Sequence, residues 1–157
     1  RLPFGDESFD LITILGVLYN KGVNDDDMAI REAHRVLKRG GILIIDEAAF
    51  SFLQSKHNID VGGVRRYTRG ELSEKCVRSG LQILKKSYWN MLLLPVFYVI
   101  AKLEHGILDK RRYSKLTRLP KTVNSILKNY LYLEAFLLRY INLPFGASVI
   151  VAARKLK

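Results

Sequence analysis

Apolar and polar segments alternate along the chain in a way that predicts strands and helices in turn. Residues 9–15 are almost entirely apolar and include β-branched residues, a pattern typical of a strand buried on both faces. After the aspartates at 25–27, residues 28–41 carry apolar positions at helical spacing and end in Lys38-Arg39 and Gly40-Gly41. A second apolar run, 41–50, contains Asp46-Glu47. A strand, helix and strand in close succession predict a parallel pair and an α/β fold.

The remaining pattern adds a loop, a helix, two strands and a helical insertion. Residues 50–66 are mostly polar and predict a loop, and Thr68 and Glu71 have the spacing of a capping box before a helix that stops at Gly80. Residues 81–89 and 147–155 predict strands. Between them, 91–108 and 121–142 read as long helices, so we interpret 91–142 as a helical insertion or cap. We expect one domain over 1–157.

Charged residues are divided unevenly along the chain. Residues 1–60 hold 7 Lys and Arg against 10 Asp and Glu, whereas residues 61–157 hold 19 against 5. Such asymmetry favours an anionic partner, which could be a phosphate-bearing substrate, a membrane surface or nucleic acid, although a solvated basic face would look the same. We expect no specific nucleic-acid partner, because no reading motif is present and the aromatic residues lie in apolar runs.

The single cysteine and the lengths of the apolar runs bear on the expected location of the protein. Cys76 is the single cysteine, and no Cys and His spacing typical of a metal site surrounds it. We therefore expect no metal, a packed thiol and a cytoplasmic location. The apolar run at 91–101 is too short to span a bilayer, which needs about 20 residues. The chain begins at Arg1 without an initiator methionine, and we expect a fragment or a processed piece.

Three ordered blocks carry a resemblance to a known family. They read LPFGDESFDLITILGVLYN, AIREAHRVLKRGGILIIDEA and RRYTRGELSEKCVRSGLQI, and the closing LPFGASVIVAARK completes them. Together they resemble class I S-adenosylmethionine-dependent methyltransferases. The resemblance implies a Rossmann-like sheet that ends in an antiparallel strand, and S-adenosylmethionine as cofactor. It also implies that Leu2 lies beside the adenine and that Leu15, Gly16 and Val17 run beside the methionine part.

The chain departs from the family pattern at several points. The family's glycine-rich loop after the first strand and the acidic residue after the second are not in this sequence, so we interpret the chain as the C-terminal portion of the fold, with little cofactor affinity of its own. Relatives commonly carry an acidic residue and Glu-His where this chain has Gly16 and Tyr19-Asn20. A Gly-His of the third block is Gly62-Gly63 here. We therefore assign no catalytic residue from the family.

Candidate substrate groups follow the second strand. His57 could act as base or substrate ligand, and Arg65, Arg66 and Tyr67 form a group able to hold a carboxylate or phosphate. Asp46 or Glu47 could accept a proton, and a carboxylate that caps nearby backbone is an equal alternative.

Two functions stay open at this stage. The first is methyl transfer from S-adenosylmethionine to a small-molecule acceptor, lipid-like, quinone-like or glycan-linked, once the missing N-terminal half is joined. The second is a non-catalytic or membrane-surface interaction module with a methyltransferase-like fold. The helices at 91–142 could enclose a hydrophobic acceptor, lie on a membrane, or pack against the sheet or against a second copy in a homo-oligomer.

Overall fold

A four-stranded mixed sheet forms the centre of the computed structural model, which describes residues 1–60, 62–106 and 120–156. Its strands lie in the order β1-β2-β4-β3. β1 and β2 are parallel, and β4 runs antiparallel to both β2 and β3. The predicted α/β class, parallel pair and antiparallel closing strand are confirmed. The strands are β1 (Phe9–Leu15), β2 (Leu37–Ala48), β3 (Leu81–Trp89) and β4 (Ser148–Lys155).

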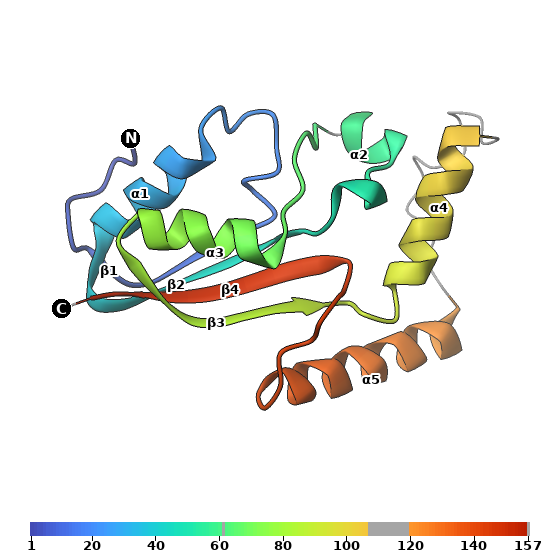
Figure 1. Ribbon diagram of the computed structural model, residues 1–157. Helices are drawn as coiled ribbons and strands as arrows, with labels where there is room; N and C mark the ends of the chain where they lie inside the picture. The colour runs from blue at the N-terminus through green and yellow to red at the C-terminus, as the bar shows by residue number, and fades with distance from the viewer. Residues whose placement is uncertain (61, 107–119, 157) are drawn as a thin grey trace.

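Helices cover the two faces of the sheet unequally (Figure 1). α1 (Asp26–Val36) and α3 (Arg69–Arg78) lie over one face and enclose the main core. α5 (Lys121–Leu138) runs below the opposite face, and α4 (Leu94–Gly106) stands at the end of the molecule next to it. The core includes Leu18, Ile30, Leu43, Ile45, Leu72, Val149 and Val151, all fully buried.

Local capping explains where the two core helices begin. The Asp25 side chain accepts a 2.8 Å hydrogen bond from the Met28 N–H at the start of α1. At α3, the Thr68 hydroxyl accepts from the Glu71 N–H, and the Glu71 carboxylate accepts from the Thr68 N–H. These bonds satisfy amides that have no partner within a helix, and they confirm the predicted capping box.

The structure corrects two expectations about the first strand and helix. β1 is an edge strand of the described sheet: Ile12 and Ile14 pack against the core, while Leu11 and Leu15 are exposed, so it is not buried on both faces. α1 ends at Val36, and the residues from Leu37 to Gly41 belong to β2. Leu37 pairs with Phe9 of β1, which holds its backbone extended, and Gly40 adopts a φ of +79° where the pairing of the two strands shifts register.

The segment expected as an irregular loop contains short helices. A 3₁₀ turn covers Ser51–Leu53, and α2 covers Lys56–Asp60. The Ser55 hydroxyl accepts from the Asn58 N–H, a local bond that favours a helical turn. The helix predicted at 91–108 begins at Leu94, as α4, and the helix predicted at 121–142 ends at Leu138, as α5. Residues 107–119 lie outside the described part of the chain. Within that part, no helix is long and apolar enough to cross a membrane.

Candidate functional site at the carboxyl ends of β1 and β2

The carboxyl ends of the two parallel strands meet at Gly16 and Asp46. The Gly16 N–H donates a 2.8 Å hydrogen bond to the Asp46 carbonyl, which extends the strand pairing by one residue beyond Leu15. Gly16 then turns the chain with φ at +60°, a conformation that glycine adopts without the strain a side chain would bring. This is the edge of a parallel sheet at which ligands bind in open α/β folds.

Glu47 fixes the turn that follows Gly16. Glu47 is 2% exposed, and its carboxylate accepts hydrogen bonds from the backbone N–H groups of Val17 at 3.0 Å, Leu18 at 2.7 Å and Tyr19 at 3.2 Å. Burial raises the pKa of Glu47 above its ordinary value, while the three N–H donors oppose that shift. Of the two alternatives open for Glu47, the backbone-capping role is the one that this geometry supports.

Asp46 presents a carboxylate to a cavity beside the strand ends. The Trp89 indole N–H donates to Asp46 Oδ1 at 2.8 Å and fixes the carboxylate. Burial raises the pKa of Asp46, and the Trp89 hydrogen bond partly offsets the rise. A carboxylate with a raised pKa is a better proton acceptor than an ordinary aspartate. Asp46 is therefore the candidate acid or base of this site.

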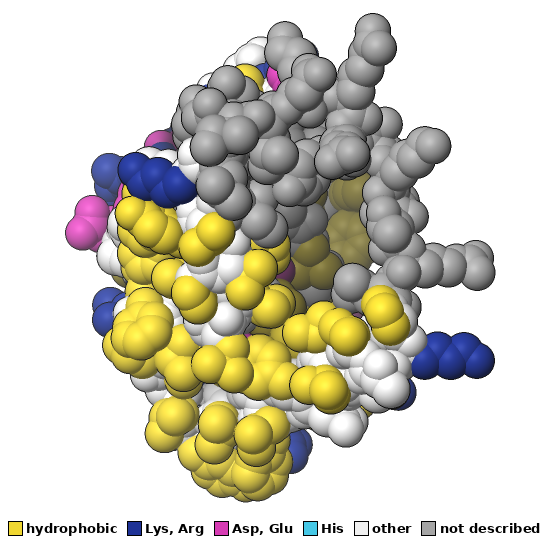
Figure 2. Space-filling view, turned by 90° about the vertical axis from the view of Figure 1, so that its right-hand side faces the viewer, with side chains coloured by type: hydrophobic (Ala, Val, Ile, Leu, Met, Phe, Trp, Pro, Cys, Tyr) yellow, Lys and Arg dark blue, Asp and Glu magenta, His cyan; other side chains and the backbone are white. Residues whose placement is uncertain are grey.

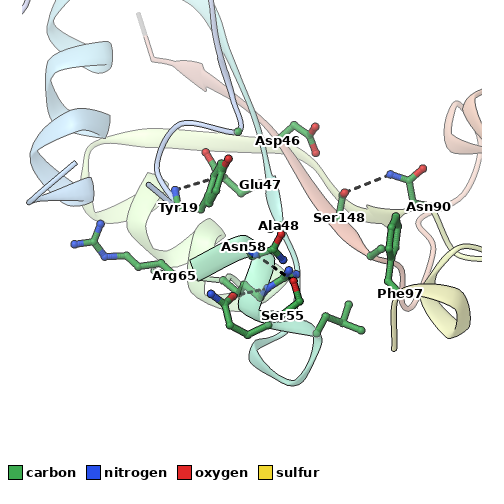
Figure 3. A pocket seen from close by; sticks show the side chains of 15 residues that line it. Tyr19, Asp46, Glu47, Ala48, Ser55, Asn58, Arg65, Asn90, Phe97 and Ser148 are labelled. Carbon is green, nitrogen blue, oxygen red and sulfur yellow. Dashed lines mark hydrogen bonds between the residues drawn. The ribbon is translucent and has the colours of Figure 1, made fainter. Parts of the chain in front are cut away.

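The cavity has a volume of about 490 Å³, within the range of small-molecule sites. Figure 3 shows that its walls come from the strand ends, from the segment around α2 and from α4. Asn90 donates to the Ser148 hydroxyl at 3.3 Å on one side, and Phe97 reaches in from α4. Lining residues are Gly16, Tyr19, Asp46, Glu47, Ala48, Leu53, Gln54, Ser55, Asn58, Arg65, Arg66, Asn90, Phe97, Ala147 and Ser148.

The two predicted arginines line this cavity but are engaged by the protein itself. Arg65 donates to the carbonyls of Leu18, Val23 and Asn24. Arg66 donates to the Gln54 amide oxygen at 2.8 Å and to the Ala49 carbonyl at 2.9 Å, and burial lowers its pKa. Both guanidinium groups therefore tie the segment after α2 to the strand ends. Their predicted role in holding an anionic substrate stays a prediction.

Tyr67 belongs to a buried polar network behind the cavity wall. Its hydroxyl lies 2.8 Å from Asp26 Oδ2 and 3.1 Å from the Leu18 carbonyl, and its side chain is 1% exposed. Burial and the neighbouring Asp26 raise the pKa of Tyr67. Lys75 donates to both Asp26 and Asp27. The aspartates at 25–27 cluster within 4.8 Å, but the α1 cap and these ion pairs account for them without a metal.

The predicted cofactor residues lie in two places. Gly16 lines the cavity, and the flanking Leu15 and Val17 are 59% and 47% exposed along the open edge of β1. The Leu2 N–H donates to Glu32 Oε2 at 2.8 Å, which ties the N-terminal segment to α1. These contacts leave their cofactor roles as predictions. The predicted substrate residue His57 lies in α2, and its side chain is outside the described part of the chain.

Sequence reasoning missed several cavity residues. Ser55 and Asn58 come from the segment interpreted as a loop, Asn90 directly follows β3, Phe97 belongs to α4 in the helical insertion, and Ser148 starts the last strand. Each is an ordinary polar or aromatic residue without a motif around it. Position was a usable signal for Asn90, which directly follows the predicted strand 81–89, and for Ser148, at the start of the predicted strand 147–155. Ser55, Asn58 and Phe97 carried no such signal.

Comparisons with known proteins place the fold. Residues 1–45 match the family described as methyltransferase domain. The chain is 48% identical over 58 residues to the ubiquinone/menaquinone biosynthesis C-methyltransferase UbiE of Pseudoalteromonas translucida, a match covering 37% of this chain and 21% of the relative. The match thus spans about a fifth of that relative's length.

Solved structures match over nearly the whole chain. The [4+2]-cyclase SpnF superposes with a TM-score of 0.54 at 25% identity, covering 99% of this chain and 54% of that one. A S-adenosylmethionine-dependent methyltransferase from Mesorhizobium loti superposes with a TM-score of 0.56 at 16% identity, covering 98% of this chain and 65% of that one. The resemblance to class I S-adenosylmethionine-dependent methyltransferases that the sequence blocks predicted is confirmed.

Proposed function

Because this chain has the class I methyltransferase fold and its first 45 residues match the methyltransferase domain, we propose that the protein transfers a methyl group from S-adenosylmethionine to a small-molecule acceptor. The observation that carries the proposal is the cavity of about 490 Å³ at the carboxyl ends of β1 and β2, with Gly16 and Asp46 in its wall. Ligand sites of open α/β sheets lie at this edge.

The residues around Gly16 suit one side of a cofactor cleft. Gly16 allows a ligand to approach the backbone, and Glu47 holds the following turn rigid. The exposed Leu15 and Val17 offer apolar contact along the edge of β1. S-adenosylmethionine supplies an activated methyl group on a sulfonium. The protein then needs chiefly to align acceptor and methyl group, which is an orientation effect worth several kcal/mol.

The acceptor that fits best is a hydrophobic ring compound with an ionisable group. Leu53, Phe97 and Ala147 supply apolar wall, and Asp46 supplies a carboxylate at one side. The relatives' quinone biosynthesis role supports an acceptor of the quinone-like class. In this arrangement the Asp46 carboxylate takes up the proton that the substrate loses when it receives the methyl group, and Trp89 keeps the carboxylate in place.

The test is methyl transfer by the full-length gene product from labelled S-adenosylmethionine to a demethylated quinone-type acceptor. Asp46→Asn should lower the rate about 10²- to 10⁴-fold, the range for loss of a general base. Because burial raises the Asp46 pKa, the wild-type rate should rise as pH passes through that raised pKa, and Asp46→Asn should lack this rise. Asp10→Asn, at the exposed start of β1, is the matched control. A rate unchanged by Asp46→Asn contradicts Asp46 as base.

A second candidate is a non-catalytic interaction module. It is favoured by the engagement of Arg65, Arg66 and Tyr67 with the protein's own backbone and side chains. The same fold also serves a structural neighbour named as a [4+2]-cyclase. Absence of methyl transfer to any quinone-type acceptor, together with absence of S-adenosylmethionine binding, would favour this candidate.

A further inference from the structure

α5 carries an apolar face that points away from the sheet. Ile126, Tyr132, Leu133, Phe136 and Leu137 of α5, with Tyr140 in the turn directly after it, follow one another at helical spacing, and they are between 38% and 72% exposed. The opposite side of the helix turns inward: Glu134 is 3% exposed and accepts a 2.9 Å hydrogen bond from the Met91 N–H. The apolar face of α5 therefore lies on the side of the helix that does not pack against the rest of the protein.

A row of cations borders this face. Lys121, Lys128 and Arg139, the residue that caps the end of the helix, are all exposed. Lys128 and Arg139 follow Lys121 by 7 and 18 residues, close to whole numbers of turns, so the three lie along one edge of the helix. Glu134 is the acidic residue of α5, and it is buried. The exposed surface of α5 therefore combines apolar side chains with positive charge.

The neighbouring helix extends the same kind of surface. Val96, Tyr98 and Val99 of α4 are exposed, and Lys102 Nζ lies 5.7 Å from the centre of the Tyr98 ring. In the same way, Lys128 Nζ lies 5.6 Å from the centre of the Tyr132 ring. Figure 2 looks at this end of the molecule and shows hydrophobic side chains gathered over its lower part, with Lys and Arg at the sides.

We propose that the apolar face of α5 docks on an anionic lipid surface. Its apolar side chains would enter the boundary between headgroups and acyl chains, and the cation row would meet the anionic headgroups. Charge complementarity favours an anionic bilayer over a second copy, because the same face of a second copy would bring further cations and no exposed acidic side chain of α5. Tyrosines beside lysines are also characteristic of the membrane–water boundary. The proposal does not depend on methyl transfer.

Docking in this position would bring the cavity near the membrane. Phe97 is 43% exposed on α4 and also lines the cavity to which Asp46 contributes. A helix pair held at the bilayer surface would therefore place one wall of the site close to lipid.

The test is flotation of the full-length gene product with vesicles of phosphatidylcholine alone or with about 30% phosphatidylglycerol, a charge density at which bound lysines contribute measurably. Binding should be strong to the anionic vesicles, weak to the neutral ones, and reduced by salt. Lys121→Glu/Lys128→Glu should reduce binding at least about tenfold. The matched control is Lys86→Glu/Arg154→Glu, on exposed sheet positions with the same charge change, and it should retain binding.

A second variant tests the apolar contribution separately. Ile126→Ser/Leu133→Ser leaves the charge unchanged and should also lose at least about tenfold in vesicle binding, with thermal melting as the check that it is folded. Equal binding to neutral and anionic vesicles, or equal loss in the control, overturns the proposal. So does a wild-type dimer that Ile126→Ser/Leu133→Ser converts to a monomer while vesicle binding is unchanged, because the face would then join two copies.

Discussion

The Tyr19 ring lies directly against Gly63. A Cβ at Gly63 would lie 3.1 Å from the Cδ2 and Cε2 atoms of Tyr19 and 2.8 Å from the Asn58 carbonyl oxygen. Tyr19-Asn20 and Gly62-Gly63 are two places where the sequence departs from the methyltransferase pattern, and Asn20 and Gly63 also form a backbone bridge. The two departures are therefore one structural change: an aromatic ring fills space that a larger residue at 63 would need.

Gly63→Ala should destabilise the protein by about 1–3 kcal/mol, because the added methyl group overpacks against backbone and ring. Gly70→Ala is the matched control, since a Cβ there meets nothing within 4 Å. It should be neutral or mildly stabilising in a helix. Urea unfolding of both variants measures the difference. Adding Tyr19→Ala to Gly63→Ala should recover part of the loss, and equal stability of the Gly63 and Gly70 variants contradicts the contact.

Glu47→Gln should loosen the turn after Gly16. Val17 and Leu18 donate to Glu47 Oε1, and Tyr19 donates to Oε2. A glutamine has one acceptor oxygen, so an oxygen that replaces Oε1 leaves its NH2 group facing the Tyr19 N–H donor. We expect a loss of about 2 kcal/mol in the free energy of unfolding. Glu74→Gln, at an exposed position of α3, should change little. If both variants unfold at the same urea concentration, Glu47 does not fix the turn.

Tyr67→Phe separates a structural role from the substrate role that the sequence suggested. The change leaves the Leu18 carbonyl and Asp26 Oδ2 without the hydroxyl donor and should cost about 1–3 kcal/mol of stability. Tyr132→Phe, at an exposed ring of α5, is the control. A substrate-binding Tyr67 would instead leave thermal stability unchanged and raise KM.

Acid should weaken the network of Asp26, Asp27 and Lys75. Burial opposes ionisation of Asp26, but hydrogen bonds from Tyr67 and Lys75 lower its pKa, and the Lys75 hydrogen bond lowers that of Asp27. Their stabilisation is present above the unfolded value of 3.8 and is lost as pH falls through the lowered folded pKa values. Lys75→Met should therefore destabilise by about 1–3 kcal/mol at neutral pH and much less near pH 2. A difference that is independent of pH contradicts the ion pairs.

Local signals predicted most elements, and long-range contacts decided the rest. The apolar run at 9–15 predicts a strand, and the spacing of Thr68 and Glu71 predicts a capping box. Both signals come from residues close together in the chain, and the strand and the capping box are confirmed. The partners of Arg65 lie more than 40 residues away in the chain, and no spacing rule connects them. The same holds for Trp89 of β3 and Asp46 of β2, which lie on the two strands that flank β4 in the sheet. Sequence therefore located the edge of the sheet that carries the site, but not which side chains remain available there.

We propose that Gly16 and the turn held by Glu47 form one side of an S-adenosylmethionine cleft. The most direct measurement is a calorimetric titration of the full-length gene product with S-adenosylmethionine. We expect saturable binding with one site per chain, weakened at least about tenfold by Gly16→Val, which strains a backbone held at φ +60°. No binding heat at saturating cofactor, in a protein shown to be folded by its melting transition, would contradict the claim.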